Sequence, residues 1–324
     1  MKMEQVLKLV EPDLAKLEIE IERLVTTRVG FIKEIAHYII KSGGKRIRPI
    51  LVMLSSKLCG YEGEKHIPYS AIVEFIHTAT LLHDDVVDNA KTRRGASTAN
   101  MIWGNEASVL VGDFLYAKSF ELMGDEDNLE IVKVMAHTTK LLSEGEILEL
   151  VKTSDINTTE DDYYEIIGNK TAVLFAVACE IGTILCNTDK KTRLSLRDFG
   201  YNLGMAFQLT DDMLDYISDD EALGKKVGTD LKEGKVTLPL IHTIKSAADK
   251  EKTMIQTILR KNRVTAKDFE RVHAVIEKYG GIAYTAATTK KYTDAAKYCL
   301  NMFGGSRYKD ALLVLPDYIL KRKT

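Results

Sequence analysis

Proline is scarce in this sequence, with 5 prolines among 324 residues. Because proline removes a backbone donor and interrupts helices, its scarcity favours long helices over a strand-rich architecture. Sustained alternation of apolar and polar residues, which half-buried strands require, is also missing. No segment repeats at the period of about 20–50 residues that is typical of solenoids. The sequence therefore predicts an all-α protein.

Cysteine is also rare, and the four cysteines, Cys59, Cys179, Cys186 and Cys299, show no C-x-x-C spacing. A chain long enough to bury a large core does not need a disulfide framework, so a reduced setting fits better. The N-terminal segment MKMEQVLKLVEPDL has acidic residues where a secretory signal needs an unbroken apolar run. We therefore expect a cytoplasmic protein.

Neither a strong net charge nor a long hydrophobic run is present. The formal net charge of −2 gives no global basic field for nucleic acid, so we expect no nucleic-acid partner. The most apolar stretch, residues 171–186, is interrupted by Glu180 and is shorter than the roughly 20 residues that span a bilayer. It predicts a buried helix, and we expect no transmembrane segment.

The residues that are abundant fit a large helical core. Apolar residues make up 45% of the chain and recur at helical spacing almost everywhere, while 28% charged residues can cover the surface. No linker rich in serine, proline or glycine divides the chain. The sequence predicts a single domain, residues 1–324, of ten or more helices.

The motif Asp-Asp-x-x-Asp occurs twice, at residues 84–88 and 211–215. On a helix, the first and last aspartates of such a motif lie four residues apart on one face, so their carboxylates converge. Like charges at this spacing repel, and both motifs follow apolar helical segments. Magnesium is the natural compensating cation, because it takes oxygen ligands and bridges carboxylates to phosphates.

A less specific interpretation is that the motifs are two solvated acidic helix ends. Two copies, each at the end of an apolar segment, argue against it. Each motif is also followed by a basic pair, Arg93–Arg94 after the first and Lys225–Lys226 after the second. We therefore predict that both motifs bind metal.

The segment KSGGKRIRP, residues 41–49, places three cations beside a Gly-Gly turn, with a proline suited to the start of a helix. Backbone N–H groups at a helix start and forked guanidinium groups together favour anion binding. Further basic residues lie near each acidic motif. His77 lies seven residues before Asp84 on the same helical face, which leaves open a core role or a diphosphate contact.

With these motifs, the chain resembles bacterial trans-polyprenyl diphosphate synthases of the isoprenyl diphosphate synthase superfamily, most closely the octaprenyl type. The resemblance runs nearly end to end. It is carried by GGKRIRP, EFIHTATLLHDDVVD, RRG, ASVLVGDFLY, EGEILEL, KTAVLF, FQLTDDMLDY and LGKKVGTDLKEGKVTLPL.

The resemblance implies a role for each residue that matches the motifs of the family. Magnesium ligands would be Asp84, Asp88, Asp211 and Asp215, and Asp85 and Asp212 would assist them in catalysis. Isopentenyl diphosphate would bind Lys45, Arg48, His77 and Arg94. The allylic diphosphate would bind Arg93, Lys170, Thr171, Gln208, Lys225 and Lys235.

The family also implies a helical bundle around a central cavity, a homodimer, and about three magnesium ions per active site. The reaction it implies is the repeated head-to-tail condensation of isopentenyl diphosphate onto an allylic diphosphate such as farnesyl diphosphate. Cations neutralise the leaving diphosphate, which lets the allylic C–O bond ionise. A long all-trans polyprenyl diphosphate for quinone side chains results, with transient membrane contact as the product leaves.

The length of the product depends on the space below the first acidic motif. Ala79 and Thr80, one helical turn before Asp84, are small, whereas the resemblance implies a bulky aromatic there in short-chain relatives. Val73 and Ile76 continue an apolar path along the helix. Phe120, Met123 and Met135 are candidates for the floor of this tunnel, although ordinary core packing also explains each of these side chains.

Several other functions share some of these features. A shorter-chain synthase, making farnesyl or geranylgeranyl diphosphate, would need only a blocked tunnel. A non-catalytic subunit of a heteromeric prenyl synthase would be expected to have lost aspartates or basic residues. A terpene cyclase would carry a different second motif, and a structural metal-binding protein would not need GGKRIRP. The intact motifs favour the long-chain synthase.

Overall fold

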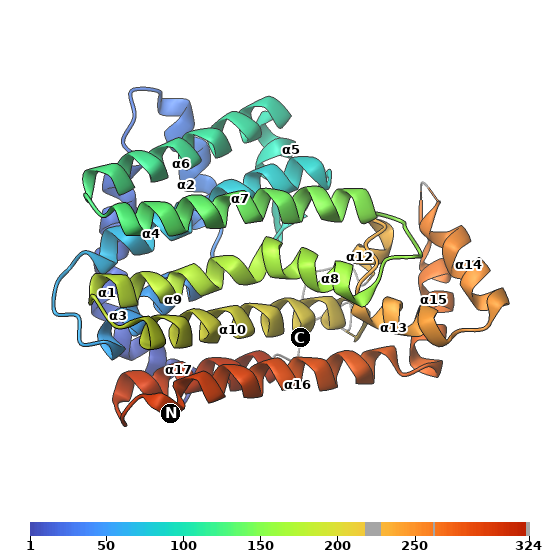
Figure 1. Ribbon diagram of the computed structural model, residues 1–324. Helices are drawn as coiled ribbons and strands as arrows, with labels where there is room; N and C mark the ends of the chain where they lie inside the picture. The colour runs from blue at the N-terminus through green and yellow to red at the C-terminus, as the bar shows by residue number, and fades with distance from the viewer. Residues whose placement is uncertain (218–227, 262, 322–324) are drawn as a thin grey trace. The chain divides into compact units, whose positions relative to one another are not determined.

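The structure is a computed structural model that describes residues 1–217, 228–261 and 263–321 (Figure 1). Helices dominate it. Within these ranges the only strands are β1 (Thr92–Arg93) and β2 (Ala96–Ser97), which pair antiparallel. The predicted all-α class, with ten or more helices, is confirmed.

Helices follow one another along the described parts of the chain. The first half of the chain forms α1 (Met3–Leu24), α2 (Gly30–Lys41), α3 (Ile47–Leu58), α4 (His66–Val87), α5 (Ala99–Trp103), α6 (Asn105–Asp125) and α7 (Leu129–Lys152). The second half forms α8 (Glu160–Ile167), η1 (Gly168–Ala172), α9 (Val173–Leu185), α10 (Lys190–Ile217), α12 (Thr229–Lys232), α13 (Leu238–Ser246), α14 (Asp249–Leu259), α15 (Ala266–Lys278), α16 (Gly281–Cys299), η2 (Leu300–Met302) and α17 (Arg307–Leu320).

Residue contacts group the chain into two compact units. The first unit comprises Met1–Thr139, Leu174–Gly200 and Cys299–Val314, and the second comprises Lys140–Val173, Tyr201–Tyr298 and Leu315–Thr324. The boundaries fall inside helices, so that α7, α9, α10, α16 and α17 contribute residues to both units. That residues 1–324 form a single domain stays a prediction.

In the first unit, α4 is the central helix. It packs against α6, α3 and α1 (Figure 1). Because neighbours cover it on several sides, α4 is apolar over most of its circumference, with Ile72, Phe75 and Ile76 fully buried. The first acidic motif lies where this buried helix ends, at Asp84–Asp88.

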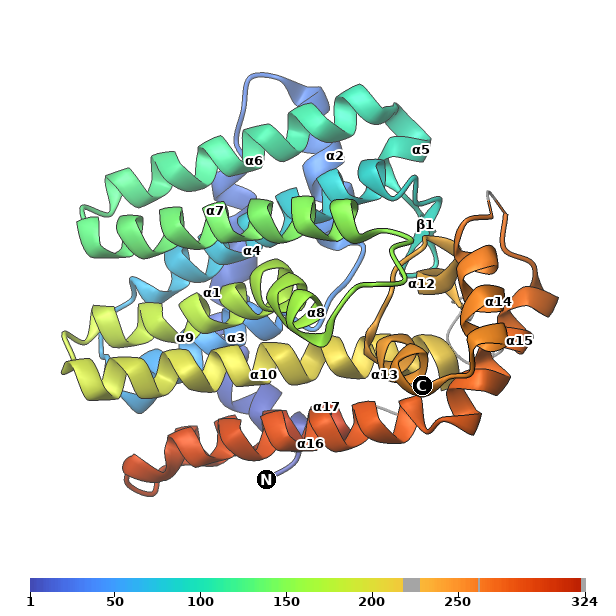
Figure 2. The ribbon, with the colours of Figure 1, turned by 45° about the vertical axis from the view of Figure 1, so that its right-hand side comes forward.

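Helices α3 and α9 pack closely together in the first unit (Figure 2). A Cβ atom at Gly182 of α9 would lie 2.3 Å from Ser55 Oγ and 2.5 Å from the backbone nitrogen of Ser56 on α3. Such distances are shorter than van der Waals contact, so only glycine allows this approach. The two helix backbones therefore meet with almost no side chain between them at this point.

The second unit has its own hydrophobic core, built mainly from α8, α10 and α12 to α15. Leu209, Leu238, Ile255, Val272 and Ile276 are among its fully buried members. Figure 2 shows α14 and α15 side by side. Between α8 and α9 the chain forms η1, a single π-helical turn, which is a feature often found at functional sites.

One helical stretch among the described residues, Glu160–Leu185, is long and apolar enough to cross a membrane by length and composition alone. Most of it is covered by the protein: 89% of its most apolar window is buried. Burial of this extent is typical of a core helix. It agrees with the buried helix predicted for residues 171–186.

Candidate active site

The first acidic motif spans the C-terminal end of α4. Asp84 and Asp88 are partly exposed, whereas Asp85 is fully buried. The backbone N–H of Asp88 donates to the carbonyl of Asp84 at 2.8 Å, so the helical spacing holds to the last aspartate. Asp84 and Asp88 therefore share one face of α4, as the four-residue spacing predicts.

Asp85 faces the protein and holds the loop that follows α4. The Nε and Nη2 atoms of Arg93 lie 2.8 and 2.7 Å from Asp85 Oδ1. Burial raises the pKa of Asp85, and Arg93 opposes that rise. Its other oxygen, Oδ2, is buried and accepts no hydrogen bond, which leaves one carboxylate oxygen beside the motif for a cationic group.

Within the basic segment, Arg46 has a structural role. Its backbone is left-handed, with φ of 48°, and its guanidinium donates to Glu18 at 3.0 Å and to Glu74 at 2.6 Å. It also donates to the carbonyl of Ile40. These bonds tie the turn before α3 to α1, α2 and α4, and they engage Arg46 within the protein.

Arg48, two residues further along the segment, has different neighbours from Arg46: Phe175 and His77. The Arg48 guanidinium lies over the Phe175 ring, 4.7 Å from its centroid. His77 is surrounded by Arg48 and Arg94, and burial together with these cations holds its pKa well below the usual value. His77 is therefore neutral at pH 7, and can offer a ring N–H without adding charge.

Arg94 lies near His77, as Arg48 does, and also contacts the Gly-Gly turn. A Cβ atom at Gly44 would lie 3.0 Å from Arg94 Nη1, so Arg94 rests against the bare backbone of the Gly-Gly turn. Lys45, which directly follows Gly44, is exposed. The structure thus brings Arg48, His77 and Arg94 together beside the turn that carries Lys45, as predicted for an anion site.

The second acidic motif lies in the last turns of α10, and its middle aspartate is sequestered. The hydroxyl of Tyr163 donates to Asp212 Oδ2 at 2.5 Å, and Gln208 Nε2 donates to Asp212 Oδ1 at 2.7 Å. Burial, reinforced by the charge of Asp211, raises the pKa of Asp212 to about 7 despite these bonds. Both oxygens of Asp212 are engaged inside the second unit.

The last aspartate of this motif organises the chain beyond it. Asp215 accepts from the backbone N–H of Thr229 at 3.1 Å and from that of Asp230 at 3.0 Å. Its own carbonyl accepts from the N–H of Gly228 at 2.9 Å. Burial and the neighbouring Asp215 and Asp212 raise the pKa of Asp230, which favours its neutral form.

A cavity of about 90 Å³ in the second unit lies beside this motif. Its charged and polar lining includes Glu149, Lys152, Lys170, Thr171, Gln208, Asp212, Asp230 and Lys235. Four residues predicted to meet the allylic diphosphate, Lys170, Thr171, Gln208 and Lys235, therefore lie together. Lys225, predicted for the same role, lies outside the described residues.

Acidic residues of α7 and at the end of α12 pair with two lysines of this cavity. Lys170 Nζ lies 2.5 Å from Glu149 Oε2 and 2.8 Å from Glu146 Oε2, and Lys235 Nζ lies 2.7 Å from Glu233 Oε2. The hydroxyl of Thr171 donates to Gln208 Oε1 at 2.9 Å. Thr171, Gln208, Asp212 and Tyr163 thus form one continuous hydrogen-bonded chain.

Sequence reasoning missed several of these residues. Glu146 and Glu149 stand in EGEILEL, three residues apart on one helical face, and Tyr163 stands seven residues before Lys170. These spacings were the available signals. They do not tell which side chain on another helix each residue meets, and the sequence therefore did not reveal the roles of Glu149, Tyr163 or Asp230.

The side chains predicted to line the tunnel all belong to the first unit. Those that are fully buried are Val73, Ile76, Ala79, Met123 and Met135. The hydroxyl of Thr80 donates to the carbonyl of His77 at 2.8 Å, and Phe120 is 38% exposed. Between the candidates for the floor, burial therefore favours the two methionines over Phe120. Their role in setting product length stays a prediction.

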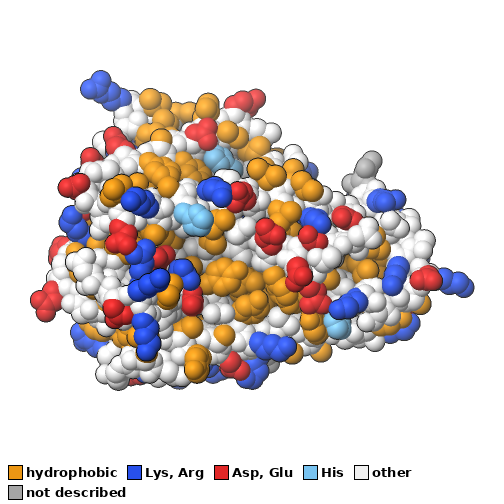
Figure 3. Space-filling model, in the orientation of Figure 1, with side chains coloured by type: hydrophobic (Ala, Val, Ile, Leu, Met, Phe, Trp, Pro, Cys, Tyr) orange, Lys and Arg blue, Asp and Glu red, His pale blue; other side chains and the backbone are white. Residues whose placement is uncertain are grey.

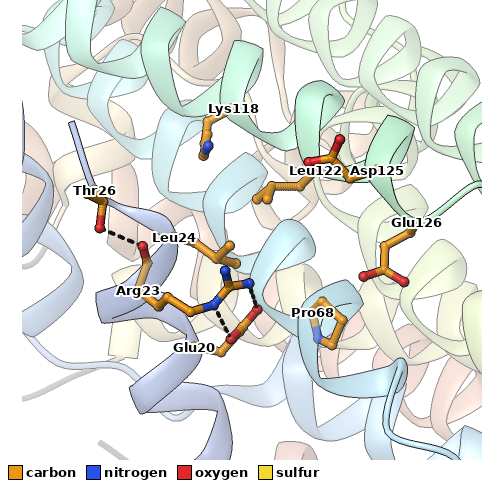
Figure 4. A pocket seen from close by; sticks show the side chains of 9 residues that line it. All are labelled: Glu20, Arg23, Leu24, Thr26, Pro68, Lys118, Leu122, Asp125 and Glu126. Carbon is orange, nitrogen blue, oxygen red and sulfur yellow. Dashed lines mark hydrogen bonds and ion pairs between the residues drawn. The ribbon is translucent and has the colours of Figure 1, made fainter. Parts of the chain in front are cut away.

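A larger cavity, of about 180 Å³, lies elsewhere in the first unit, beside α1, α4 and α6 (Figure 4). Arg23 and Glu20, which line it, pair with each other, with 2.6 Å between Nη2 and Oε1. Lys118 pairs with Glu121, and Glu126 pairs with Lys65. None of the predicted site residues lines this cavity, so its size does not make it the active site.

The acidic residues suit magnesium by their chemistry. Among the residues that the structure describes, no three His, Cys, Asp or Glu side chains are grouped closely enough to hold a metal ion by themselves. Magnesium commonly takes one or two carboxylates and completes its shell with waters and substrate phosphates. The carboxylate-only donors of Asp84 and Asp88, and of Asp211, fit such an ion.

The chain is similar to known proteins of one family over most of its length. The model of the polyprenyl synthetase family matches residues 29–276. Octaprenyl diphosphate synthase of Escherichia coli is 38% identical over 322 residues, covering 99% of both chains. A geranyl-diphosphate-specific all-trans-nonaprenyl-diphosphate synthase of Rhodobacter capsulatus is also 38% identical, over 320 residues and 98% of both chains.

A solved structure is equally similar. The polyprenyl synthase of Caulobacter crescentus, crystallised with calcium and isoprenyl diphosphate, superposes with a TM-score of 0.95 at 39% identity. The match covers 100% of this chain and 98% of that one. Sequence and fold therefore agree over the full length of the chain.

Proposed function

Because the chain belongs to the polyprenyl synthetase family, and is thus a trans-prenyl diphosphate synthase, we propose that it makes octaprenyl diphosphate for quinone side chains. It would do so by condensing isopentenyl diphosphate repeatedly onto an allylic primer such as farnesyl diphosphate. The similarity to octaprenyl synthases over the whole chain carries this proposal. The nonaprenyl relative at equal identity makes a neighbouring product length the nearest alternative.

Isopentenyl diphosphate binds at the basic group of the first unit. Arg48, Arg94 and Lys45 supply positive charge, and a guanidinium can hold a diphosphate oxygen through two donors. Neutral His77 adds a hydrogen bond without raising the mutual repulsion of the arginines. Arg46 takes no part in binding, because Glu18 and Glu74 engage it.

The allylic diphosphate binds at the cavity of the second unit. Lys170 and Lys235 are oriented there by Glu149 and Glu233, and Thr171 is oriented by Gln208. When the anion enters, it competes with these carboxylates for the lysines. Orientation before binding reduces the entropy lost when the diphosphate is held.

Magnesium, about three ions per active site, fits Asp84, Asp88 and Asp211 as ligands. When bound, magnesium supplies charge neutralisation of the leaving diphosphate, which lowers the barrier to ionisation of the allylic C–O bond. Asp85 orients Arg93, and Asp212 is held by Tyr163. Asp215, predicted as a ligand, accepts two backbone N–H groups, which makes it better suited to fix the start of α12.

The growing tail follows α4 away from Asp84, past Ala79 and Thr80. Fully buried apolar side chains at Val73 and Ile76 continue this path, and Met123 and Met135 form its floor. Methionine suits this position because its flexible chain adapts to the shape of the tail.

A second copy of the chain covers the exposed apolar surface of α5 and α6. Met101 is 55% exposed, Ile102 46% and Leu110 65%, and Figure 3 shows hydrophobic side chains gathered over α6 in the upper part of the view. Apolar patches of this kind mark interfaces more often than isolated residues do. The homodimer acts in the cytoplasm and touches the membrane transiently to release its product.

Incubation of the purified chain with farnesyl diphosphate, labelled isopentenyl diphosphate and magnesium tests the proposal. After dephosphorylation, chromatography should show prenols of about eight isoprene units, a length inferred from the relatives. The Asp84→Ala protein serves as the inactive control. Products that stop at three or four units contradict the long-chain assignment, and an absence of extension favours a non-catalytic subunit.

A further inference from the structure

Helices α3 and α9 run parallel in a fixed register inside the first unit. Arg48 stacks on Phe175 near their N-terminal ends, and Ser55 meets Gly182 in their middle. Each pair is separated by the same number of residues (175 − 48 = 182 − 55 = 127). Parallel helices that keep one offset over two helical turns keep it at the next turn as well.

The same offset joins Cys59 and Cys186, since 186 − 59 is also 127. Cys59 follows the last residue of α3, and Cys186 follows the last residue of α9. Cys186 Sγ lies 3.6 Å from the carbonyl oxygen of Ser56, and the two thiols are near enough for each to shift the pKa of the other. Neither cysteine forms a disulfide, and both are partly exposed.

The contact at Gly182 explains why the thiols meet. Because Gly182 has no side chain, the α9 backbone approaches Ser55 and Ser56 of α3 closely, and the ends of the two helices bring Cys59 and Cys186 near each other. The pair is chemically unequal. The neighbouring Cys59 lowers the pKa of Cys186, whereas the pKa of Cys59 is raised, so Cys186 is the more readily ionised thiol of the two.

We propose that Cys59 and Cys186 form a dithiol site that small-molecule disulfides oxidise reversibly to an intramolecular disulfide. The Cys186 thiolate attacks one sulfur of the small disulfide, which forms a mixed disulfide and releases one small thiolate. The Cys59 thiol then loses its proton to solvent and attacks Cys186 Sγ, which releases the second small thiolate. One small disulfide is reduced to two thiols, and one protein dithiol is oxidised.

The new bond would staple the C-terminal ends of α3 and α9 in the arrangement they already have. It would lie eleven residues beyond Arg48, or about 16 Å along α3, so the anion site would keep its geometry. A cross-link between residues so far apart in sequence restricts the unfolded chain strongly. We expect the melting temperature of the oxidised protein to rise by roughly 5 °C.

The test is chemical and independent of the enzymatic assay. The folded protein is incubated with oxidised glutathione, remaining thiols are alkylated, and peptides are mapped by mass spectrometry. The expected result is a cross-linked peptide joining Cys59 to Cys186, the loss of two titratable thiols, and recovery of both with dithiothreitol. The Cys299→Ser variant, which removes another partly exposed cysteine, should behave as wild type.

With oxidised glutathione, Cys59→Ser should retain a glutathione adduct on Cys186. Cys186→Ser should react with oxidised glutathione at least tenfold more slowly than Cys59→Ser does. Stable mixed disulfides on wild-type Cys186 without a cross-link would overturn the proposal. So would a cross-link that forms equally fast in urea-unfolded protein, because the folded register would then contribute nothing. Melting curves of oxidised and reduced protein provide the second measurement. A melting temperature that is unchanged or lowered on oxidation contradicts a stabilising disulfide between α3 and α9.

Discussion

Aspartates at different places within an acidic motif have different surroundings in this protein. Asp84 and Asp88 are partly exposed at the end of α4, while Asp85 and Asp212 are buried against Arg93 and Tyr163. Buried carboxylates that accept hydrogen bonds orient their neighbours, whereas partly exposed ones can meet a hydrated cation. The two functions follow from burial, which differs between adjacent residues.

Replacement of Asp84 or Asp211 by alanine tests the metal ligands. Each change should lower kcat by several orders of magnitude, because a loss of about 3–4 kcal/mol of electrostatic stabilisation corresponds to a factor of about 10²–10³ for each contact removed. Steady-state kinetics measures the loss, and circular dichroism checks that the helices remain. Full activity in excess chelator would contradict the assignment.

Removal of the Tyr163 hydroxyl tests whether Asp212 is positioned through it. The hydrogen bond from Tyr163 lowers the pKa of Asp212, so Tyr163→Phe should raise that pKa above about 7. Protonated Asp212 would then persist to higher pH, and the acidic limb of the kcat/KM profile should shift upward by about one pH unit.

The neighbouring Tyr164→Phe variant is the matched control for this shift, because Asp212 is bonded to Tyr163 and not to Tyr164. Its profile should coincide with that of wild type. If Tyr163→Phe lowers activity by the same factor at every pH, Tyr163 only supports packing, and the proposed coupling to Asp212 is wrong.

At the scale of an element, two arginines at the start of α3 have different partners. Arg46 is bonded to Glu18 and Glu74, whereas Arg48 is grouped with His77 and Arg94. Arg48→Ala and Lys45→Ala should therefore raise the KM for isopentenyl diphosphate by about 10–100-fold, and that for the primer less. Initial rates with each substrate varied in turn measure the difference.

Arg46→Ala is the structural counterpart of these variants. It leaves the nearly buried Glu74 without its partner, which should destabilise the fold by about 3 kcal/mol without a selective change in KM. If Arg48→Ala raises the KM for the primer more than the KM for isopentenyl diphosphate, the two substrates have been assigned to the wrong sites.

Helix α4 itself sets the space for the product. Ala79 lies five residues, or about 7 Å, before Asp84 and is fully buried. A tyrosine there should block the tail after two or three isoprene units, because a packed interior does not yield to so large a ring. Ala79→Tyr should thus make mainly farnesyl or geranylgeranyl diphosphate, as judged by chromatography of the prenols. Wild-type product length in this variant would show that the tail takes another route.

For the whole molecule, the apolar surface of α5 and α6 predicts self-association. Leu110→Glu would bring a charge into the interface and should convert the dimer to monomers at micromolar concentration. Sedimentation velocity measures the change. Ile19→Glu, at an equally exposed apolar residue of α1, is the control and should remain dimeric. A Leu110→Glu protein that sediments as wild type contradicts an interface at α6.

The sequence alone determined the all-α class, both acidic motifs, the basic turn before α3 and the small residues below Asp84. All of these are local: helical periodicity, a four-residue spacing and a glycine pair are complete within one segment of chain. The resemblance of the whole sequence to polyprenyl diphosphate synthases then predicted the family, which the comparisons confirm. The roles of Lys45, Arg48 and Lys170 stay predictions, although the structure places Lys170 beside Thr171 and Gln208 as expected.

Only the tertiary structure decided which members of each motif face inward. Asp212 meets Tyr163 from a helix 49 residues away, Arg46 meets Glu74 across 28 residues, and Cys59 meets Cys186 across 127. Such contacts depend on how helices pack, and packing is set by close approaches such as the one at Gly182. A linear pattern records the chemistry of a side chain, whereas its partner, and hence its pKa and its role, is fixed only when distant segments meet.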